Sequence, residues 1–173
     1  MKAYHFLRQG MAAGSGAEPA WKVGERRTYE GKIVLCSSGY HSSQTWYNAL
    51  QYAPGPIACI VDISKPVERD TDKQVSATRT LVDYRDATRE LRLFGADCAE
   101  RVLYLFEKQR PNDDRPRKAI EVARRFANGE ATDQERAAAW DAAWDAAGNA
   151  AGAAARRWQR RRLNWYMRHL FQS

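Results

Sequence analysis

Short apolar stretches separated by polar loops dominate the first half of the chain. Residues 57–63 are apolar except for one aspartate, which is typical of a strand buried on both faces. In residues 74–81 a period of two predicts a half-exposed strand, in which Val75, Ala77, Arg79 and Leu81 alternate with Gln74, Ser76, Thr78 and Thr80. A weaker alternation over residues 3–7 and a β-branched run over residues 32–35 predict two further short strands.

Turn-forming residues divide these strands and delimit one short helix. Ser43 is expected to cap a helix that Pro54-Gly55-Pro56 ends, because a serine oxygen satisfies free N–H groups and proline disrupts a helix. Residues 9–20 are rich in glycine and alanine and have no structural period, so we expect a loop there.

The second half has the pattern of helices. An apolar stripe at spacings of three and four residues predicts an amphipathic helix over residues 87–108. The stripe consists of Leu91, Phe94, Cys98, Val102, Leu105 and Phe106. Pro116 suits the first turn of a second helix and Gly129 suits its end. The buried face of this second helix is expected to consist of Ile120, Ala123 and Phe126.

A long helix rich in alanine and tryptophan is expected to follow. It begins after Thr132-Asp133-Gln134-Glu135, which has the form of a capping box, and extends to about Leu170. Gly148 and Gly152 leave its continuity open, because each glycine costs about 1 kcal/mol relative to alanine within a helix.

These elements predict an α+β fold. A small N-terminal mixed α/β domain is expected over residues 1–86, and a C-terminal helical bundle containing the long Ala/Trp-rich helix over residues 87–173. A chain of 173 residues is long enough to bury a core in one unit or in two small ones.

Composition restricts the class of protein. No apolar run approaches the roughly 20 residues that a membrane span needs, so no membrane partner is expected. The three cysteines are an odd number spread along the chain, unlike a disulfide framework, and this favours a reducing cytoplasm.

Basic residues concentrate near the C-terminus and account for much of the net charge of +7. After Asp145 the chain has no acidic residue, whereas six arginines lie between residues 156 and 168. Such a cluster suits an acidic protein surface, the phosphates of a nucleic acid, or a solvated helix end favoured by the helix dipole. The candidate partner-binding residues are Arg156, Arg157, Trp158, Arg160, Arg161 and Trp165.

Tryptophans recur at heptad spacing in the same region. Trp144, Ala151, Trp158 and Trp165 are each seven residues apart, which places them on one side of a helix. This stripe is expected to pack on the other helices or on a second copy of the chain, so a homo-oligomer is one possibility. Stacking of exposed tryptophans on nucleic-acid bases is the alternative.

Cys36 and His41 are the weak candidates for catalysis. A thiol and an imidazole within one turn suit a nucleophile and its base, but no third residue is evident to orient them. His5, His41 and His169 lack the spacing of a metal site, and no glycine-rich phosphate motif occurs. We therefore expect no metal and no cofactor, and a binding protein rather than an enzyme.

Several segments resemble the start of an uncharacterised family of phage and prophage domains. They are Met1-Lys2-Ala3-Tyr4, Leu35-Cys36-Ser37-Ser38-Gly39-Tyr40-His41-Ser42, Ala49-Leu50-Gln51-Tyr52-Ala53-Pro54-Gly55 and Asp72-Lys73-Gln74-Val75. The resemblance covers about residues 1–95, and members often end in Ala/Trp/Asp-rich helices, as residues 140–144 do here. It implies a mobile-element origin and a location in the host bacterial cytoplasm, with no established activity.

A second region resembles an all-helical family of immunity proteins from bacterial toxin systems. The resemblance lies in Phe94 to Leu103, Phe106-Glu107, Pro111 to Ile120 and Ala127 to Glu130. It covers roughly residues 94–130 and implies a protein that binds and blocks a toxin.

A third resemblance is to half of an ADP-ribosyltransferase fold. The order strand, Gly-Tyr-His-Ser-Ser turn, helix and strand up to Ile63 is similar. Of the residues that such an enzyme needs, His41, Ser42 and Ser43 are suggestive, and no matching glutamate is evident.

The leading functional prediction is a phage- or prophage-encoded protein that inhibits a bacterial defence or toxin component through protein–protein contacts, as an anti-CRISPR or other anti-defence protein. Its partner would be a bacterial protein or nucleoprotein complex. The alternatives are a toxin immunity protein, a nucleic-acid-binding protein that uses the C-terminal Arg/Trp helix, and an ADP-ribosyltransferase-like enzyme.

Overall fold

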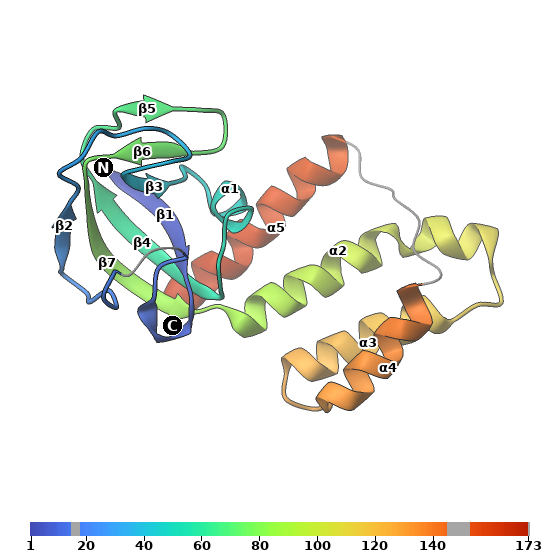
Figure 1. The fold of residues 1–173 in the computed structure, drawn as a ribbon. Coiled ribbons are helices and arrows are strands. Elements are labelled where there is room, and N and C mark those ends of the chain that lie inside the picture. The colour runs from blue at the N-terminus through green and yellow to red at the C-terminus, as the bar shows by residue number, and fades with distance from the viewer. Residues whose placement is uncertain (15–17, 145–152, 173) are drawn as a thin grey trace. The chain divides into compact units, whose positions relative to one another are not determined.

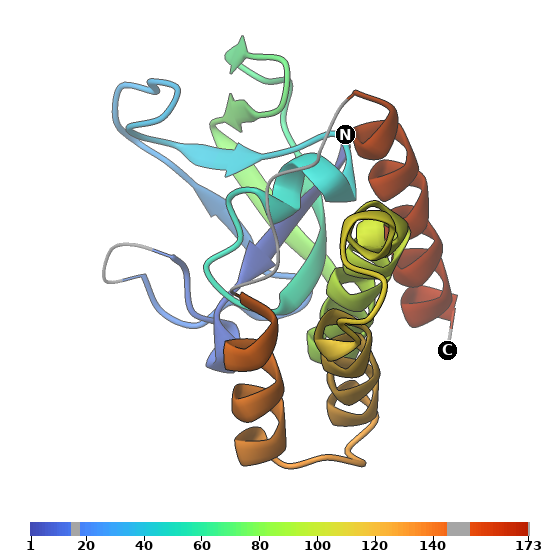
Figure 2. The ribbon, with the colours of Figure 1, turned by 90° about the vertical axis from the view of Figure 1, so that its right-hand side faces the viewer.

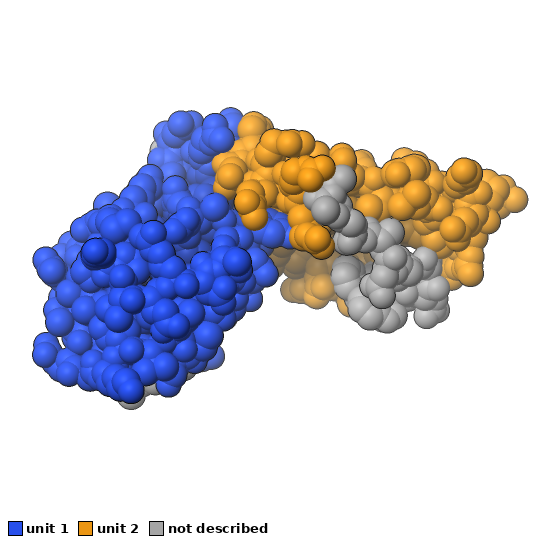
Figure 3. Space-filling view, turned by 90° about the horizontal axis from the view of Figure 1, so that it is seen from above, with its two compact units in different colours: residues 1–87, 167–173 blue, residues 88–166 orange. Residues whose placement is uncertain are grey.

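The computed structural model describes residues 1–14, 18–144 and 153–172, and the side chains of residues 140–144 and 153–155 are not among the described atoms. The chain forms two compact units (Figure 3).

Unit 1 comprises residues 1–87 and 167–173, and unit 2 comprises residues 88–166. The described strands all belong to unit 1, whereas unit 2 is helical. This arrangement confirms the predicted α+β class.

A four-stranded antiparallel sheet with the order β1-β4-β7-β2 forms the larger part of unit 1 (Figure 1). Its strands are β1 (Lys2–Leu7), β4 (Ile57–Ile63), β7 (Thr78–Asp86) and β2 (Arg26–Thr28). β4 pairs with a neighbour on each edge, and most of its residues are buried. The near-continuous apolar sequence of this central strand follows from that position.

A second, three-stranded sheet has the order β3-β6-β5. It consists of β3 (Tyr40–Ser42), β6 (Gln74–Ser76) and β5 (Glu68–Arg69), and its neighbouring strands are antiparallel. Tyr4 and Ser43 exchange two backbone hydrogen bonds of 2.9 Å each, which join β1 to the end of β3.

Two groups of apolar side chains form the core of unit 1. The main cluster consists of Ala3, Leu7, Trp21, Tyr40, Ile57, Cys59, Val61, Ile63 and Leu81. On β1, Tyr4 and Phe6 alternate with these residues and contact the ring of Trp46 at centroid distances of 4.4 and 5.7 Å. Trp46 also stacks on Phe171 at 5.4 Å, so the C-terminal end of the chain completes this second group.

The strand predicted over residues 32–35 is absent, and this prediction is wrong. Val34 forms only an isolated bridge with Ser38, and its carbonyl accepts the N–H groups of Ser37 and Ser38. The β-branched residues therefore sit in a tight turn, because their backbone groups are satisfied locally instead of by a neighbouring strand.

The short helix begins later than predicted. Helix α1 spans Trp46–Leu50, and Thr45 caps it by accepting the N–H of Asn48 at 3.2 Å. Ser43 is instead part of the bridge to Tyr4, and its hydroxyl donates to the carbonyl of Asp72 at 2.7 Å. Because Ser43 pairs with β1 in this way, it does not cap the helix, and Thr45 takes that role instead.

The single strand predicted over residues 74–81 is divided at Ala77. Residues 74–76 form β6 of the smaller sheet, and β7 of the larger sheet begins at Thr78. Alternation of polar and apolar positions continues across the division, so the sequence pattern does not reveal it. Within the loop expected over residues 9–20, Gln9–Met11 form a 3-10 turn, η1.

Unit 2 begins with α2 (Thr88–Gln109) and α3 (Arg115–Ala127), which confirm the first two predicted helices. They are followed by α4 (Asp133–Trp144), and α3 packs against both neighbours (Figure 2). The buried apolar cluster of unit 2 consists of Ala96, Leu103 and Ile120, and Ala123 packs against this cluster.

The buried stripe of α2 differs from the predicted one. Its buried residues are Leu93, Phe94, Ala96, Asp97 and Leu103. Leu105, assigned to the stripe by its spacing, is 38% exposed. The apolar period alone did not identify the buried face of α2, because this face contains the buried carboxylate of Asp97.

The predicted capping box is confirmed at the start of α4. The backbone N–H of Thr132 donates to Glu135 Oε2 at 2.7 Å, and the N–H of Glu135 donates to Thr132 Oγ1 at 3.2 Å. The last helix, α5, spans Ala153–Gln172. Gly148 and Gly152, on which the continuity of the expected long helix depends, lie outside the described residues.

Among the helices of the described chain, none combines the length and the apolar character that crossing a membrane requires.

Candidate functional site

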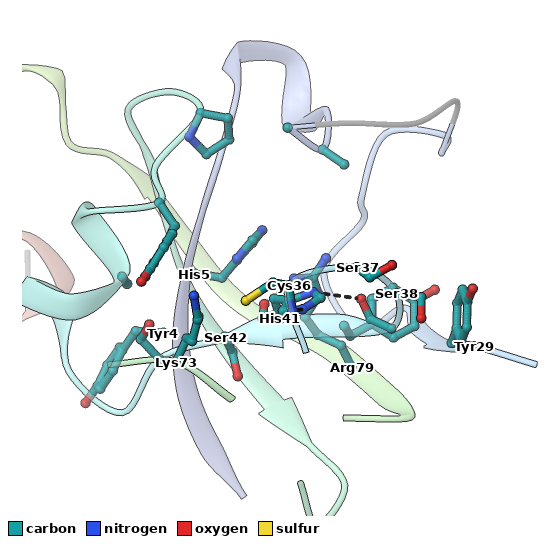
Figure 4. A pocket seen from close by; sticks show the side chains of 18 of the residues that line it. Tyr4, His5, Tyr29, Cys36, Ser37, Ser38, His41, Ser42, Lys73 and Arg79 are labelled. Atoms are coloured by element: carbon teal, nitrogen blue, oxygen red, sulfur yellow. Dashed lines mark hydrogen bonds between the residues drawn. The ribbon is translucent and has the colours of Figure 1, made fainter. Parts of the chain in front are cut away.

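A cavity of about 560 Å³ lies beside β3 in unit 1 (Figure 4). Its wall is formed by β1, the turn before β3, β3 itself and the segment around α1. Its lining includes Tyr4, His5, Cys36, His41, Lys73 and Arg79. The volume falls within the range of small-molecule sites, so the cavity is the first candidate site.

The turn before β3 places the Cys36 side chain on this wall. Cys36 and Gly39 have φ angles of +67° and +98°, in the left-handed region. The turn is held by the hydrogen bond from the Ser38 hydroxyl to the carbonyl of Lys32 at 2.6 Å. Such a conformation is uncommon for a residue with a side chain, so surrounding contacts must maintain it at Cys36.

Both ring nitrogens of His41 are hydrogen-bonded within the same turn. Nε2 accepts the backbone N–H of Cys36 at 2.8 Å and therefore carries no proton. Nδ1 lies 3.2 Å from the carbonyl oxygen of Gly39, to which it donates. Burial lowers the pKa of His41; the bond to Gly39 opposes this effect, and the charges of Arg79 and Lys73 reinforce it.

This arrangement bears on the candidate pair Cys36 and His41. The nitrogen that could accept a proton from the thiol is occupied by the backbone of Cys36 itself. The structure thus brings the two residues together, but it holds the imidazole as a neutral structural acceptor.

The neighbour of the Cys36 thiol is Lys73, which the sequence analysis did not single out. A hydrogen bond with the Cys36 side chain is the largest cause that raises the pKa of Lys73, and Tyr52 adds to it. The Lys73 Nζ atom also lies 5.0 Å from the centroid of the Tyr52 ring. Lys73 lies just before β6 and so far from Cys36 along the chain that no motif connects them.

Arg79, on β7, places a buried guanidinium at the cavity. The residue is 5% exposed, and its Nη1 atom donates to the carbonyl of His41 at 3.1 Å. Its guanidinium carbon lies 4.6 Å from the ring centroid of Trp21 and 5.0 Å from that of Tyr40. Burial lowers the pKa of Arg79 to about 10, against the opposing effect of Glu18.

The two histidines of the cavity predict loss of stability in mild acid. The pKa of His5 is also lowered, first by burial and then by the charges of Arg79 and His41. Between their folded pKa values and about 6.5 the unfolded chain binds more protons, so the free energy of unfolding should fall as the pH decreases below 6.5. The expected slope is up to about 1.4 kcal/mol per pH unit for each histidine.

Urea unfolding at several pH values between 7 and 5 measures this effect, since ordinary carboxylates titrate lower. His41→Gln should reduce the slope, because glutamine does not titrate. A flat profile in the parent chain would contradict the neutral state of both rings.

The predicted partner-binding arginines lie on α5 in unit 2. Arg156, Arg157, Arg160 and Arg161 are all exposed. Their spacings of one, four and five residues place them on one face of the helix, which we call the arginine face.

The two tryptophans of the predicted set differ in exposure. Trp158 is half-buried, and the guanidinium carbon of Arg101 on α2 lies 4.8 Å from its ring centroid. Trp165 is 46% exposed and makes an edge contact with Tyr166 at 5.0 Å. Of the expected heptad stripe, the side chains of Trp144 and Ala151 lie outside the described residues.

A buried charge cluster connects α2, α3 and α5 within unit 2. Asp97 is 5% exposed and contacts Arg124 at 2.7 Å, Arg162 at 2.5 Å and the hydroxyl of Tyr166 at 2.7 Å. Burial raises the pKa of Asp97, but the hydrogen bonds from these three groups outweigh it, so the pKa is lowered. No local sequence pattern reveals this cluster, because Asp97 lies within an apolar stripe and its partners are distant in the chain.

Histidine, cysteine and acidic side chains do not gather into a metal site in the part of the chain that the structure describes. No group of three or more is placed to hold an ion there.

Two protein-family models match the chain. Residues 1–91 match a domain of unknown function, DUF7666, and residues 85–160 match the model described as "Imm-5 like putative immunity protein". The second match supports the immunity resemblance of the helical region, whereas a phage or prophage origin stays a prediction. No curated protein and no solved structure matches the chain.

Proposed function

Because the chain belongs to the DUF7666 family through residues 1–91 and matches the Imm-5 like immunity model over residues 85–160, we propose that it is an immunity protein that binds and neutralises a bacterial toxin. The immunity match is the observation that carries this proposal. It favours the toxin-immunity alternative over the anti-CRISPR or other anti-defence function, for which the comparisons offer no specific support.

The proposed toxin-binding surface is the arginine face of α5. Arg156, Arg157 and Arg160 fall within the matched region, and Arg161 follows directly. Arginine donates bidentate hydrogen bonds to carboxylates, so the complementary surface of the toxin is expected to be acidic.

Neighbouring aromatic residues would extend this surface. The exposed part of Trp165 offers apolar contact area of the kind that dominates binding energy in protein interfaces. Trp158 contributes less directly, because Arg101 covers its ring.

We assign a separate role to each of the two proposed domains. The helical domain, residues 87–173, would hold the toxin, and the N-terminal domain, residues 1–86, would serve a separate purpose. We place the protein in the host bacterial cytoplasm, where a toxin produced by the same or a neighbouring cell would act.

Charge reversal tests the arginine face. We expect the double variant Arg160→Glu and Arg161→Glu to weaken toxin binding about 100-fold, since each reversal replaces an attraction by a repulsion at the interface. The matched control is Lys108→Glu with Arg110→Glu, which makes the same change of charge at the end of α2. Both variants should retain the circular dichroism spectrum of the parent chain.

The readout has two steps. The full chain captures partners from a bacterial lysate with and without nuclease, and each captured protein is then expressed alone and together with the chain. A toxin partner stops growth alone, and the parent chain and the control restore growth, whereas the α5 variant does not. If the α5 variant restores growth as well as the parent chain does, the arginine face is not the toxin-binding surface.

Nucleic-acid binding by the same arginines is the competing function. It predicts that nuclease treatment removes the captured material and that affinity decreases steeply with salt. That result, without any protein that stops growth, would overturn the immunity proposal.

A further inference from the structure

We propose that the cavity of unit 1 binds a small molecule through a phosphate group held between Arg79 and Lys73. This inference concerns the N-terminal domain and does not depend on toxin binding by α5.

Arg79 carries a buried charge that no direct ion pair within the described chain neutralises. Its neighbour across the sheet, Arg27, has carboxylate partners, with Glu25 at 2.9 Å and Glu18 at 3.6 Å. Arg79 is more deeply buried, yet among the described residues no carboxylate forms an ion pair with it. Glu18 acts on Arg79 only from beyond ion-pair distance, and a buried charge without a directly paired carboxylate is costly, so an anion in the adjoining cavity would offset this cost.

Arg79 has unused hydrogen-bonding capacity. A guanidinium has five N–H donors, and within the described chain one of them, on Nη1, donates to the carbonyl of His41. Trp21 and Tyr40 stabilise the charge through their ring faces without accepting these protons. The remaining donors are therefore available to a ligand in the cavity that Arg79 lines.

A second cation and a hydroxyl group also line the cavity. Lys73 lines the cavity, and its ammonium lies close enough to His41 for both Lys73 and Arg79 to lower the pKa of that ring. Ser37 adds a hydroxyl to the lining of the cavity (Figure 4). Cations flanking a polar pocket are what phosphate recognition requires.

The histidines and the glutamate of the cavity wall do not cancel the positive charge of Arg79 and Lys73. His5 and His41 have lowered pKa values and contribute no charge at neutral pH. Glu18 is the acidic side chain of the lining, and Arg27 contacts its carboxylate at 3.6 Å. Two cations against one carboxylate that already has a partner favour an anion of more than one charge, and the guanidinium fork of Arg79 suits two oxygens of one phosphate group.

The size of the cavity indicates more than an inorganic ion. A volume of about 560 Å³ is typical of sites for small organic molecules, and tyrosine rings at Tyr4, Tyr29, Tyr40 and Tyr52 form part of the wall. The ligand class is accordingly a phosphorylated organic molecule whose remaining part contacts aromatic side chains.

Inorganic pyrophosphate is the probe for the phosphate site, and malonate is the carboxylate control. Calorimetric titration of the full chain should show saturable binding of pyrophosphate in the millimolar range or tighter, and at least tenfold weaker binding of malonate. Lys73→Gln should weaken pyrophosphate binding at least tenfold, the loss of one charge-assisted hydrogen bond. Lys65→Gln removes one exposed charge of unit 1 that is outside the cavity wall and should leave binding unchanged.

The reactivity of Cys36 provides a second measurement of binding that is independent of calorimetry. It is exposed on the cavity wall, whereas Cys59 is buried and Cys98 is half-buried in α2. Pyrophosphate should slow the alkylation of Cys36 by the neutral reagent iodoacetamide and leave Cys98 unaffected, as peptide mass spectrometry would show.

Three results would overturn the proposal. They are the absence of saturable pyrophosphate binding together with unprotected Cys36, equal affinity for malonate, and equal weakening by the Lys73 and Lys65 variants. Arg79→Lys keeps the charge but removes the guanidinium fork, and it should also weaken binding in a chain that retains its circular dichroism spectrum. Loss of pyrophosphate binding would not affect toxin capture, so the two proposals fail separately.

Discussion

Replacing Asp97 by asparagine is expected to lower the free energy of unfolding of unit 2 by about 3 kcal/mol. The substitution keeps the size of the side chain but removes the charge that Arg124 and Arg162 share. It also leaves one of the three donors without a strong acceptor in a position that is 5% exposed. Because these partners come from α3 and α5, the loss should affect the packing of all three helices around Asp97.

Glu100→Gln is the matched control for this experiment. Glu100 lies one turn further along α2, contacts Arg124 at 2.7 Å and has a side chain that is 58% exposed. An exposed ion pair contributes at most about 1 kcal/mol, so the control should be nearly neutral. Hydrogen exchange of the α2 and α5 amides in urea measures unit 2 separately from unit 1. Equal effects of the two substitutions would contradict the role of Asp97 as a buried centre.

Gly39→Ala is the second substitution with a large expected effect, again about 3 kcal/mol, because backbone strain and a clash add to each other. Gly39 has a φ angle of +98°, which side-chain-bearing residues rarely adopt. A Cβ atom there would lie 2.8 Å from Val75 Cγ2 and 3.1 Å from Ile33 Cγ2. Val75 is fully buried in β6 and has no room to move.

The consequence should extend to the cavity, because the carbonyl of Gly39 accepts the Nδ1–H of His41. We expect the variant to lose the ordered turn, so that alkylation of Cys36 becomes faster. Gly10→Ala is the control, since Gly10 has a φ of +74° but no atom within 4 Å of the added Cβ, and it should cost only the strain term. A Gly39 variant no less stable than this control would refute the clash.

Local sequence signals were reliable where the interacting groups are neighbours in the chain. The capping box from Thr132 to Glu135 formed as predicted, because both of its hydrogen bonds span three residues. The apolar period of α2 identified the helix, although its buried face was assigned only in part. The β-branched run over residues 32–35 led to a wrong strand prediction, because a strand needs a partner strand and β propensity alone does not supply one.

The residues of the two candidate sites have a different status. The arginine face of α5 was visible in the sequence, because helical spacing and charge are both local properties. Lys73 and Arg79 were not, since the pairing of β6 with β3 and the hydrogen bond from Arg79 on β7 to the carbonyl of His41 join residues that are distant in the chain.

The sequence by itself determined the α+β class, the capping box at the start of α4, the central strand β4 and the arginine-rich helix, because each depends on periodicity or on contacts a few residues apart. Only the tertiary structure decided which polar groups are buried and with which partners. Asp97 meets Arg162 across 65 residues of chain, and the guanidinium of Arg79 lies against two aromatic rings. Burial of a charge is a property of everything packed around it, and no stretch of sequence contains that information.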